Sequence, residues 1–538
     1  MKRPTGLSVL HDPRKNKGTA FTRKERDKYG LRGILPDAVE TMDTQLLRVS
    51  EQLGSLDLPI EKYVYLTGLL DTNETLFFKT VISDAARFLP LVYTPTVGEA
   101  CERLGHIARR PRGLFISIKN KHRIVTLLKN WPGDDIRFIV VTDGQRILGL
   151  GDLGVGGMGI SIGKLALYTS CAGVPPEHTL PIVLDVGTDN EKLLNDPLYP
   201  GLKRPRVRGR AYDGFVEAFV KAVMKVYPGA CVQWEDFAGV NAIRILEKYR
   251  DRVCTFNDDV QGTAAIAVAG FIAVSRLLGR PFADQKFLFL GAGAAAFGIA
   301  DMLVKKFQKD GLGREEVLRR IRMFDVNGLL VTSRPDLADY QRPFADDGAP
   351  SSDFAECILR LRPTAIVGVS TVGGAFTRQV IENMSAVNER PVIFPYSNPT
   401  SHSECTAEQA YTWSDGRAIF ASGSPFAPVT YKGRTFTPGQ GNNVFIFPAL
   451  GMAVFATRAK RVTDEMLITA AEAVAAQITE KDFADGLIYP AVRNIREVSV
   501  NVAVRIAEVI FKSGRAGVRR PKDIRRFIEK QMYQPVYR

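Results

Sequence analysis

The segment KFLFLGAGAAAFGIA, residues 286–300, limits what this chain can fold into more than any other stretch. An apolar run precedes Gly291 and Gly293, and Ala296 completes a GxGxxA pattern, with residues 299–307 expected to be helical. The first glycine permits a tight turn, the second lets the backbone approach a pyrophosphate, and the alanine allows close packing of helix on strand. In this context the pattern predicts a Rossmann-type dinucleotide-binding domain. A turn used only for packing is the alternative.

Asp325 ends the next predicted strand, in the run IRMFDVNG. An acid at this position of a Rossmann-type domain binds the ribose hydroxyls of the dinucleotide. Asp325 follows the glycine loop at more than the usual spacing of about 20 residues, so the helix between them is predicted to be long. The carboxylate could instead cap a turn.

Short β-rich runs alternate with helical stretches through the middle of the chain. Before residue 259 the runs are GLFISI, IRFIVVTD, LPIVLDVG and ACVQWEDF, and after it they are KFLFLGAG, IRMFDVNG, TAIVGVST, PVIFPYSN and AIFASGSP. Residues 164–171 and 213–226 are predicted helices between such runs. This alternation favours α/β folds with mainly parallel sheets.

Apolar residues recur at helical spacing towards both ends, at about residues 36–89 and 463–510. We therefore predict an α/β protein in four parts. They are a helical N-terminal region (1–112), an α/β catalytic domain (113–258), a Rossmann-type dinucleotide-binding domain (259–440) and a helical C-terminal region (441–538) that is expected to complete the catalytic site.

The composition is that of a globular protein, with 45% hydrophobic and 24% charged residues in a chain of 538. No apolar run approaches the roughly 20 residues that span a bilayer, and there is no hydrophobic segment of the kind found in secretory signals. The six cysteines form no CxxC pair, which is typical of reduced, buried thiols. We expect a cytoplasmic protein without a membrane partner.

The net charge of +14 is concentrated near the two ends. One basic cluster begins with Lys2 and Arg3, and another runs from Arg515 to Arg526. Nucleic-acid contact is one interpretation of such clusters. Because no nucleic-acid-binding module accompanies them, we favour solvated ends, or ends packed on another subunit.

Two carboxylate pairs stand where β-rich runs end: Glu235 with Asp236 after CVQW, and Asp258 with Asp259 in TFNDD. Carboxyl ends of parallel strands open on one crevice, where these groups would repel one another unless a divalent cation neutralised them. The five histidines are scattered, so oxygen ligands and Mg²⁺ or Mn²⁺ are favoured over Zn²⁺. Each pair could also cap a following helix, which is compatible with metal binding.

Long motifs throughout the chain resemble those of the malic enzymes, over about residues 18–533. They read VYTPTVGEAC, TDGQRILGLGDLGVGGMGISIGKLALYTSCAG, LDVGTDNE, WEDFAGVNA, FNDDVQGTAA, FLGAGAAAFGIA, SNPTSHSECTAEQAY and PGQGNNVFIFP. The resemblance implies metal-dependent oxidative decarboxylation of L-malate to pyruvate and CO2 with reduction of NAD(P), and a capacity to decarboxylate oxaloacetate. It also implies a homo-oligomer, either a dimer or a tetramer.

The resemblance assigns catalytic roles within these motifs. Tyr93 resembles the general acid that protonates the enol at C3, and Lys164 resembles the general base for the C2 hydroxyl, with Asp258 beside it. Arg146 resembles the guanidinium that binds a malate carboxylate and the nicotinamide region. By residue type alone, each of these could be structural: a core aromatic, a surface lysine or an ion-paired arginine.

The resemblance also implies the ligand-binding residues. Glu235, Asp236 and Asp259 resemble the metal ligands, and Asn398 and Asn443 resemble substrate-binding amides. The expected cofactor-binding set is Arg146, Asp259, Gly291, Gly293, Ala296, Asp325 and Asn398.

The chain departs from the family pattern in three places. Ala294 stands where the glycine loop often has Glu, and GVSTVGG replaces the usual GVAGAG, so cofactor contacts there are expected to differ. Val326 and Asn327 stand where NADP-preferring relatives have basic residues, and further on either Gln341 or the adjacent Arg342 takes a second such position, depending on a one-residue shift in the alignment; we favour NAD over NADP. Of two arginines that bind fumarate in some relatives, Arg48 aligns with one and a threonine with the other, which argues against that site.

Two other functions compete with this interpretation. A non-decarboxylating 2-hydroxy- or amino-acid dehydrogenase would share the dinucleotide loop but need no metal. A non-enzymatic nucleotide- or nucleic-acid-binding protein would account for the basic ends.

Overall fold

The computed structural model describes residues 6–538, which form two compact units. The first unit contains the described residues up to Phe237 together with Arg526–Arg538, and the second is Ala238–Arg525. The finer division into four parts stays a prediction. Lys2 and Arg3 of the basic N-terminal cluster lie outside the described residues.

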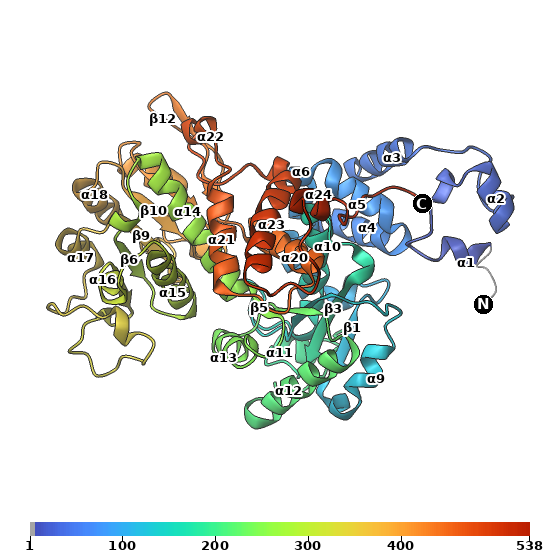
Figure 1. Cartoon of the computed structure of the whole chain (residues 1–538), viewed down its shortest axis with the longest axis horizontal. Coiled ribbons are helices and arrows are strands. Elements are labelled where there is room, and N and C mark those ends of the chain that lie inside the picture. Colours follow the sequence, from blue (N-terminus) through green and yellow to red (C-terminus); the bar gives the residue numbers. More distant parts are fainter. Residues whose placement is uncertain (1–5) are drawn as a thin grey trace. The chain divides into compact units, whose positions relative to one another are not determined.

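Helices make up the N-terminal part of the first unit, drawn in blue in Figure 1. Polar side chains at Thr41, Asn73 and Asp84 accept hydrogen bonds from the first turn of the helix that follows each of them. The helices are α1 (Leu7–Leu10), α2 (Arg23–Tyr29), α3 (Met42–Gly54), α4 (Pro59–Thr72), α5 (Glu74–Ser83), α6 (Ala85–Val92), α7 (Thr96–Glu102) and α8 (Leu104–Ile107). The predicted helical N-terminal region is confirmed.

Parallel strands form the sheet of the first unit, in the order β1 (Leu114–Ser117), β3 (Thr179–Asp185), β2 (Phe138–Thr142) and β4 (Cys231–Trp234). Every residue of β2, β3 and β4 is buried, as expected for strands covered on both faces. The connections contain α9 (Ile124–Lys129), α10 (Met158–Ala172), α11 (Glu191–Asn195) and α12 (Gly209–Val226). The carboxyl ends of β2 and β4 lead directly to Asp143 and Glu235.

A seven-stranded sheet forms the centre of the second unit, in the order β14-β11-β10-β9-β6-β7-β8. Within this sheet, only the β7–β8 pair is antiparallel among the described pairings. The strands are β6 (Phe287–Leu290), β7 (Ile321–Asp325), β8 (Gly328–Leu329), β9 (Ala365–Gly368), β10 (Val392–Pro395), β11 (Ile419–Ser422) and β14 (Gly439–Gln440). Strand order reverses between β6 and β9, and a Rossmann-type fold binds its dinucleotide at such a switch point.

Helices flank this sheet, with α16 packed on β7 and α17 on β8; Figure 1 shows α15, α16 and α17 near β6 and β9. The set is α15 (Ala294–Lys309), α16 (Arg314–Arg319), α17 (Phe354–Leu361), α18 (Arg378–Val387) and α19 (Ala407–Trp413). Short β5 (Thr255–Asn257) and the hairpin of β12 (Val429–Tyr431) and β13 (Arg434–Phe436) complete the strands. The Rossmann-type architecture is confirmed.

The C-terminal helices pack within the second unit. The contacts join α14 to α21, α21 to α23, and α20 to α23. The helices that follow α13 (Gly239–Tyr249) here are α14 (Thr263–Leu278), α20 (Phe447–Thr457), α21 (Asp464–Ala475), α22 (Glu480–Ala484) and α23 (Ile495–Lys512). The last helix, α24 (Ile524–Glu529), begins in this unit and continues into the tail that follows.

The tail Arg526–Arg538 returns to the first unit. The backbone N–H of Tyr533 donates to the carbonyl of Gly173 at 2.7 Å, and the hydroxyl of Tyr537 donates to Gln45 at 2.6 Å. The first unit is therefore built from two segments that are far apart in the sequence.

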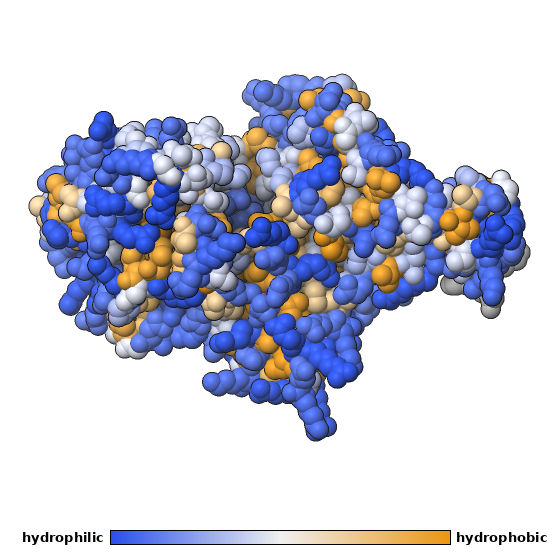
Figure 2. Space-filling view, turned by 90° about the horizontal axis from the view of Figure 1, so that it is seen from above, coloured by the Kyte–Doolittle hydropathy of each residue, from blue (hydrophilic) through white to orange (hydrophobic). Residues whose placement is uncertain are grey.

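One helical segment among the described residues, Asp258–Leu278, is long and apolar enough to span a membrane by length and composition, with a mean hydropathy of 1.5 over its most apolar window. The expectation that no run approaches that length is wrong for this segment. However, 72% of that window is buried inside the protein, as in the core helix of a folded unit. The face in Figure 2 is largely hydrophilic, with apolar residues in scattered groups.

Candidate functional site

Two side chains converge on one carboxylate in the first unit. The ammonium of Lys164, on α10, lies 2.9 Å from Oε1 of Glu235, at the end of β4. The hydroxyl of Tyr93, just after α6, donates to the same oxygen at 3.5 Å, and the Lys164 ammonium lies 5.3 Å from the centre of the Tyr93 ring. Lys164 is 3% exposed, so it is not an ordinary surface lysine. Three residues with predicted roles therefore lie together.

Two polar residues that the sequence analysis did not single out, Gln233 and Tyr168, position Glu235. The amide of Gln233 donates to Oε2 of Glu235 at 2.6 Å, and the hydroxyl of Tyr168 donates to the Gln233 carbonyl oxygen. All three side chains are buried. A glutamine inside the buried strand CVQW was the available signal, because a buried amide needs polar partners.

Asp236 follows Glu235 in a left-handed backbone conformation, with φ of 55°. Such a φ is uncommon for a residue other than glycine, and it often marks a functional site. The Asp236 carbonyl accepts a hydrogen bond from the backbone N–H of Arg146 at 3.2 Å, while the Arg146 side chain is exposed. The turn thus brings the predicted substrate-binding arginine beside the predicted metal ligands.

A buried arginine fixes the loop that carries Arg146. Arg206 donates to both carboxylate oxygens of Asp152, at 2.9 and 2.7 Å, and to the carbonyl of Asp143 at 3.0 Å. Burial raises the pKa of Asp143, although the Arg206 guanidinium opposes that effect. Arg206 was not predicted as part of the site, since the sequence did not show which acids it would meet.

Asp258 and Asn443 meet in the second unit. The Asn443 amide donates to the Asp258 carboxylate at 3.1 Å and to the hydroxyl of Thr263 at 3.1 Å. Asp258 is buried and Asp259 is partly buried, in the π-helical turn Asp258–Gly262. A Cβ at Gly262 would lie 1.9 Å from the Asp258 carboxylate, so only glycine leaves room for that group.

The glycine loop has the predicted form. Gly291 follows β6 with φ of 113°, and a Cβ there would lie 2.5 Å from the carbonyl oxygen of Val369. Space around Gly293 is open within 4 Å, and Ala296 is fully buried in α15. The loop therefore leaves an accessible backbone at the start of a helix, as a pyrophosphate site requires.

Asp325 does end β7, but its carboxylate is engaged. Both oxygens accept hydrogen bonds from the guanidinium of Arg334, each at 2.8 Å. Arg334 also contacts Asp336, and this contact lowers the pKa of the Asp336 carboxyl to about 2. A guanidinium, which the sequence did not predict, thus stands where ribose hydroxyls were expected to bind.

Asn398 lies in the loop after β10, and its side-chain oxygen accepts a hydrogen bond from Ser424 at 2.5 Å. Arg48, aligned with a fumarate-binding arginine, is instead paired through both terminal nitrogens with Glu40. All six cysteines are buried thiols that form no disulfide, as predicted.

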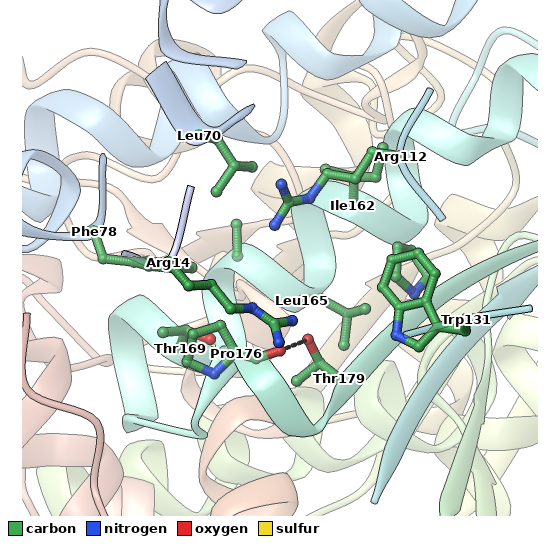
Figure 3. A pocket seen from close by; sticks show the side chains of 12 residues that line it. Arg14, Leu70, Phe78, Arg112, Trp131, Ile162, Leu165, Thr169, Pro176 and Thr179 are labelled. Atoms are coloured by element: carbon green, nitrogen blue, oxygen red, sulfur yellow. Dashed lines mark hydrogen bonds between the residues drawn. The ribbon is translucent and has the colours of Figure 1, made fainter. Parts of the chain in front are cut away.

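A cavity in the first unit lies away from these residues. Its volume is about 30 Å³, space for no more than about two water molecules. Figure 3 shows Arg14 and Arg112 on its wall, beside Ile162 and Leu165 of α10. At 100° per residue, the cavity-lining face of α10 points away from Lys164, so this cavity does not belong to the catalytic group.

Solved structures share the fold. A malic enzyme of Entamoeba histolytica aligns over 94% of this chain and 91% of its own, with 20% identity and a TM-score of 0.58. A malic enzyme of Pyrococcus horikoshii Ot3 aligns over 83% of this chain and 89% of its own, with 23% identity and a TM-score of 0.56.

Curated relatives are much more similar in sequence. The NADP-dependent malic enzyme of Anas platyrhynchos is 47% identical over 100% of this chain and 97% of its own. That of Phaseolus vulgaris is 49% identical over 99% and 91%, and NADP-dependent malic enzyme 2 of Arabidopsis thaliana is 49% identical over 99% and 92%. Since these relatives are NADP-dependent, the predicted NAD preference is wrong. Val326 and Asn327 carry no positive charge, and the guanidinium at this strand end comes from Arg334, farther along the chain.

Family models cover most of the chain. The model described as "Malic enzyme, N-terminal domain" matches residues 70–250, and "Malic enzyme, NAD binding domain" matches residues 260–511. Together with the relatives of nearly equal length, these matches agree with the motifs around Tyr93, Lys164 and Gly291. The chain belongs to the malic enzyme family.

Proposed function

We propose that this malic enzyme oxidises L-malate with NADP and decarboxylates the product to pyruvate and CO2, using Mg²⁺ or Mn²⁺. The observation that carries the proposal is the convergence of Tyr93 and Lys164 on Glu235, at 3.5 and 2.9 Å. A base, an acid and a carboxylate at one place are what an oxidation followed by enol protonation requires.

The donor set fits a hard divalent cation. Glu235 and Asp236 are buried carboxylates, and Asp259 is a partly exposed one. Oxygen-only ligands suit Mg²⁺ or Mn²⁺. We propose that these three residues hold the ion. When bound, it supplies polarisation of the 2-oxo group and stabilisation of the enolate.

The chain's own residues handle the protons. Once its ammonium has released a proton, Lys164 takes the proton of the C2 hydroxyl as a neutral amine, while the C2 hydride passes to the nicotinamide. The bond between C3 and the C4 carboxylate then breaks, and its electron pair forms the enolate. Tyr93 protonates C3, which gives pyruvate. Arg146, with its exposed guanidinium, binds a malate carboxylate, and Asn398 and Asn443 serve as substrate-binding amides.

Arg334 supports NADP as the dinucleotide. Both oxygens of Asp325 are occupied by Arg334, so the carboxylate is poorly placed to accept the two ribose hydroxyls of NAD. The Arg334 guanidinium also pairs with Asp336, and we propose that it turns from Asp336 to a 2′-phosphate when NADP binds. Gln341 donates to the carbonyl of Ala292, in the glycine loop, at 3.0 Å. The exposed Arg342 is the next residue after Gln341 and therefore lies close to this loop.

The test is a product assay on the full-length protein. We expect NADPH and pyruvate to form in equal amounts from L-malate with Mn²⁺ or Mg²⁺, and EDTA to abolish both. Oxaloacetate accumulating in place of pyruvate, or full activity in EDTA, would favour a non-decarboxylating dehydrogenase and overturn the proposal.

A further inference from the structure

Glu404 is a fully buried carboxylate in the second unit, between the loop after β10 and α19. Its Oε1 accepts three hydrogen bonds: from the backbone N–H and the hydroxyl of Ser370, at 2.9 and 2.7 Å, and from the hydroxyl of Ser397 at 2.6 Å. Its Oε2 has no hydrogen-bond partner among the described residues. Burying a carboxylate is costly unless it is hydrogen-bonded or paired, so a buried carboxylate with one unpaired oxygen needs an explanation.

These contacts tie together two loops at the carboxyl edge of the sheet. Ser370 follows β9, and Ser397 follows β10 and precedes Asn398. The hydroxyl of Ser397 also accepts a hydrogen bond from the backbone N–H of Thr371 at 2.9 Å. Both loops border the side of the switch point where a dinucleotide binds. Glu404 therefore links the loop after β9 to the loop after β10.

The link between the two loops holds Thr371 in a strained backbone conformation. Its φ is 60°, and a β-branched residue in the left-handed region is a genuine outlier that persists only when its surroundings hold it. Two hydrogen bonds fix the turn. The Thr371 backbone N–H donates to the hydroxyl of Ser397, which Glu404 holds, and the Thr371 hydroxyl donates to the Ser370 carbonyl at 2.6 Å. Thr371 is exposed, so the strain does not come from packing in the core.

The end of β9 is shaped around the same carboxylate. A Cβ at Gly368 would lie 2.5 Å from Oε2 of Glu404, and that carboxylate would have to move. The backbone carbonyl of Glu404 also accepts a hydrogen bond from Phe376 at 2.8 Å, after the Thr371 turn. The carboxylate is thus enclosed by the strand, the turn and the following loop.

We infer that Glu404 is a positioning residue for the dinucleotide: it holds the strained Thr371 turn and the Ser397 loop in the form that receives NADP. The inference rests on the proposed function for the identity of the ligand. It concerns a residue that contacts neither substrate nor cofactor and acts only through the two loops.

The experiment measures NADPH binding by fluorescence together with separate KM values for NADP and malate. We expect Glu404→Ala to raise the Kd for NADPH and the KM for NADP at least about tenfold while the KM for malate changes less than about twofold. Glu404→Gln keeps an acceptor oxygen towards both serines and is expected to retain most of the affinity. Ser403→Ala, which removes a buried hydrogen bond to the Cys405 carbonyl outside this network, is the matched control.

A rescue separates positioning from general stability. Glycine adopts the left-handed conformation without strain, so Thr371→Gly should lower the Kd for NADPH in the Glu404→Ala background. Gly368→Ala displaces the Glu404 carboxylate without removing it and should also weaken NADPH binding. This variant provides the test if Glu404→Ala does not fold.

Some outcomes would overturn the inference. They are wild-type NADPH affinity in folded Glu404→Ala, equal changes in both KM values, or no rescue by Thr371→Gly. Failure of the wild-type protein to release pyruvate contradicts the proposed function instead, and NADPH binding by the variants still tests Glu404.

Discussion

Lys164 and Glu235 form an ion pair of 2.9 Å in which each side chain is only 3% exposed. A buried pair of this kind stabilises little as a whole, but loss of one partner leaves an uncompensated charge, at a cost of about 3–5 kcal/mol. The same two residues are the proposed base and a proposed metal ligand, so stability and catalysis are linked at this position.

Lys164→Met is therefore expected to lower kcat by about 10²–10⁴ and to lower the melting temperature in EDTA. Adding Mn²⁺ should raise the melting temperature of this variant more than that of the wild type, because a cation at Glu235 replaces the lost ammonium. Thermal unfolding with and without metal checks this. Equal shifts in both proteins would contradict Glu235 as a ligand.

Gly163→Ala is expected to displace the proposed acid. A Cβ at Gly163 would lie 2.9 Å from the Tyr93 ring and 3.0 Å from the Val92 carbonyl oxygen. Overpacking of this kind costs about 1–3 kcal/mol, and a shift of about 1 Å in a catalytic group can cost about 10²-fold in rate. Gly159→Ala is the control: Gly159 lies on the same helix as Gly163, and a Cβ there would lie 2.8 Å from the sulfur of Cys101, on α7. It should lose similar stability but keep far more activity, as chemical denaturation and initial rates would show.

Arg334→Ala is expected to reduce kcat/KM for NADP by about 10- to 100-fold, the value of a charge-assisted hydrogen bond of about 1.5–3 kcal/mol. Activity with NAD should not fall, because Asp325 is released from the guanidinium. Arg322→Ala removes a different ion pair from β7, with Asp346 at 2.8 Å, and should affect both cofactors alike. Equal losses with the two cofactors in Arg334→Ala would count against a 2′-phosphate contact.

The lowered pKa of the Glu40 carboxyl predicts that part of the protein's folding stability is lost in acid. Hydrogen bonds from Arg48 and Thr19 lower the pKa of Glu40 from 4.5 to about 2. Because the folded-state pKa is below the unfolded-state value, the stabilisation is complete above about pH 4.5 and is lost as the pH falls towards 2. The stability difference between wild type and Glu40→Gln should therefore be constant from pH 7 to 5.5 and shrink below pH 4.5 in urea titrations. A difference that grows on acidification would contradict this assignment.

The elements predicted best were those whose signal is local. Gly291 and Gly293 sit in the predicted loop, and β6, β7 and β10 fall within the apolar runs that predicted them. The start of α10 was missed, because Gly157, Gly159 and Gly163 suggest a loop. A Cβ on Gly159 would meet Cys101 of α7, and a Cβ on Gly163 would meet Tyr93, just after α6, so close packing against neighbouring elements explains these two glycines.

Contacts between distant segments were the part that the sequence could not show. Arg334 follows Asp325 closely, yet nothing in the run between them indicates that the chain folds back to form a bidentate pair. Glu404 and Ser370 are separated by 34 positions, and no local pattern predicts that they meet. Candidate residues within recognised motifs could be named from the sequence, and the residues that contact and position them could not.

The return of Arg526–Arg538 to the first unit has a consequence for synthesis on the ribosome. The second unit is complete in the nascent chain before this tail emerges, whereas the surfaces around Gly173 and Gln45 wait for Tyr533 and Tyr537. The unit that begins first is thus the one that finishes last. A tag or truncation at the carboxyl end would act on the maturation of the unit that carries Lys164.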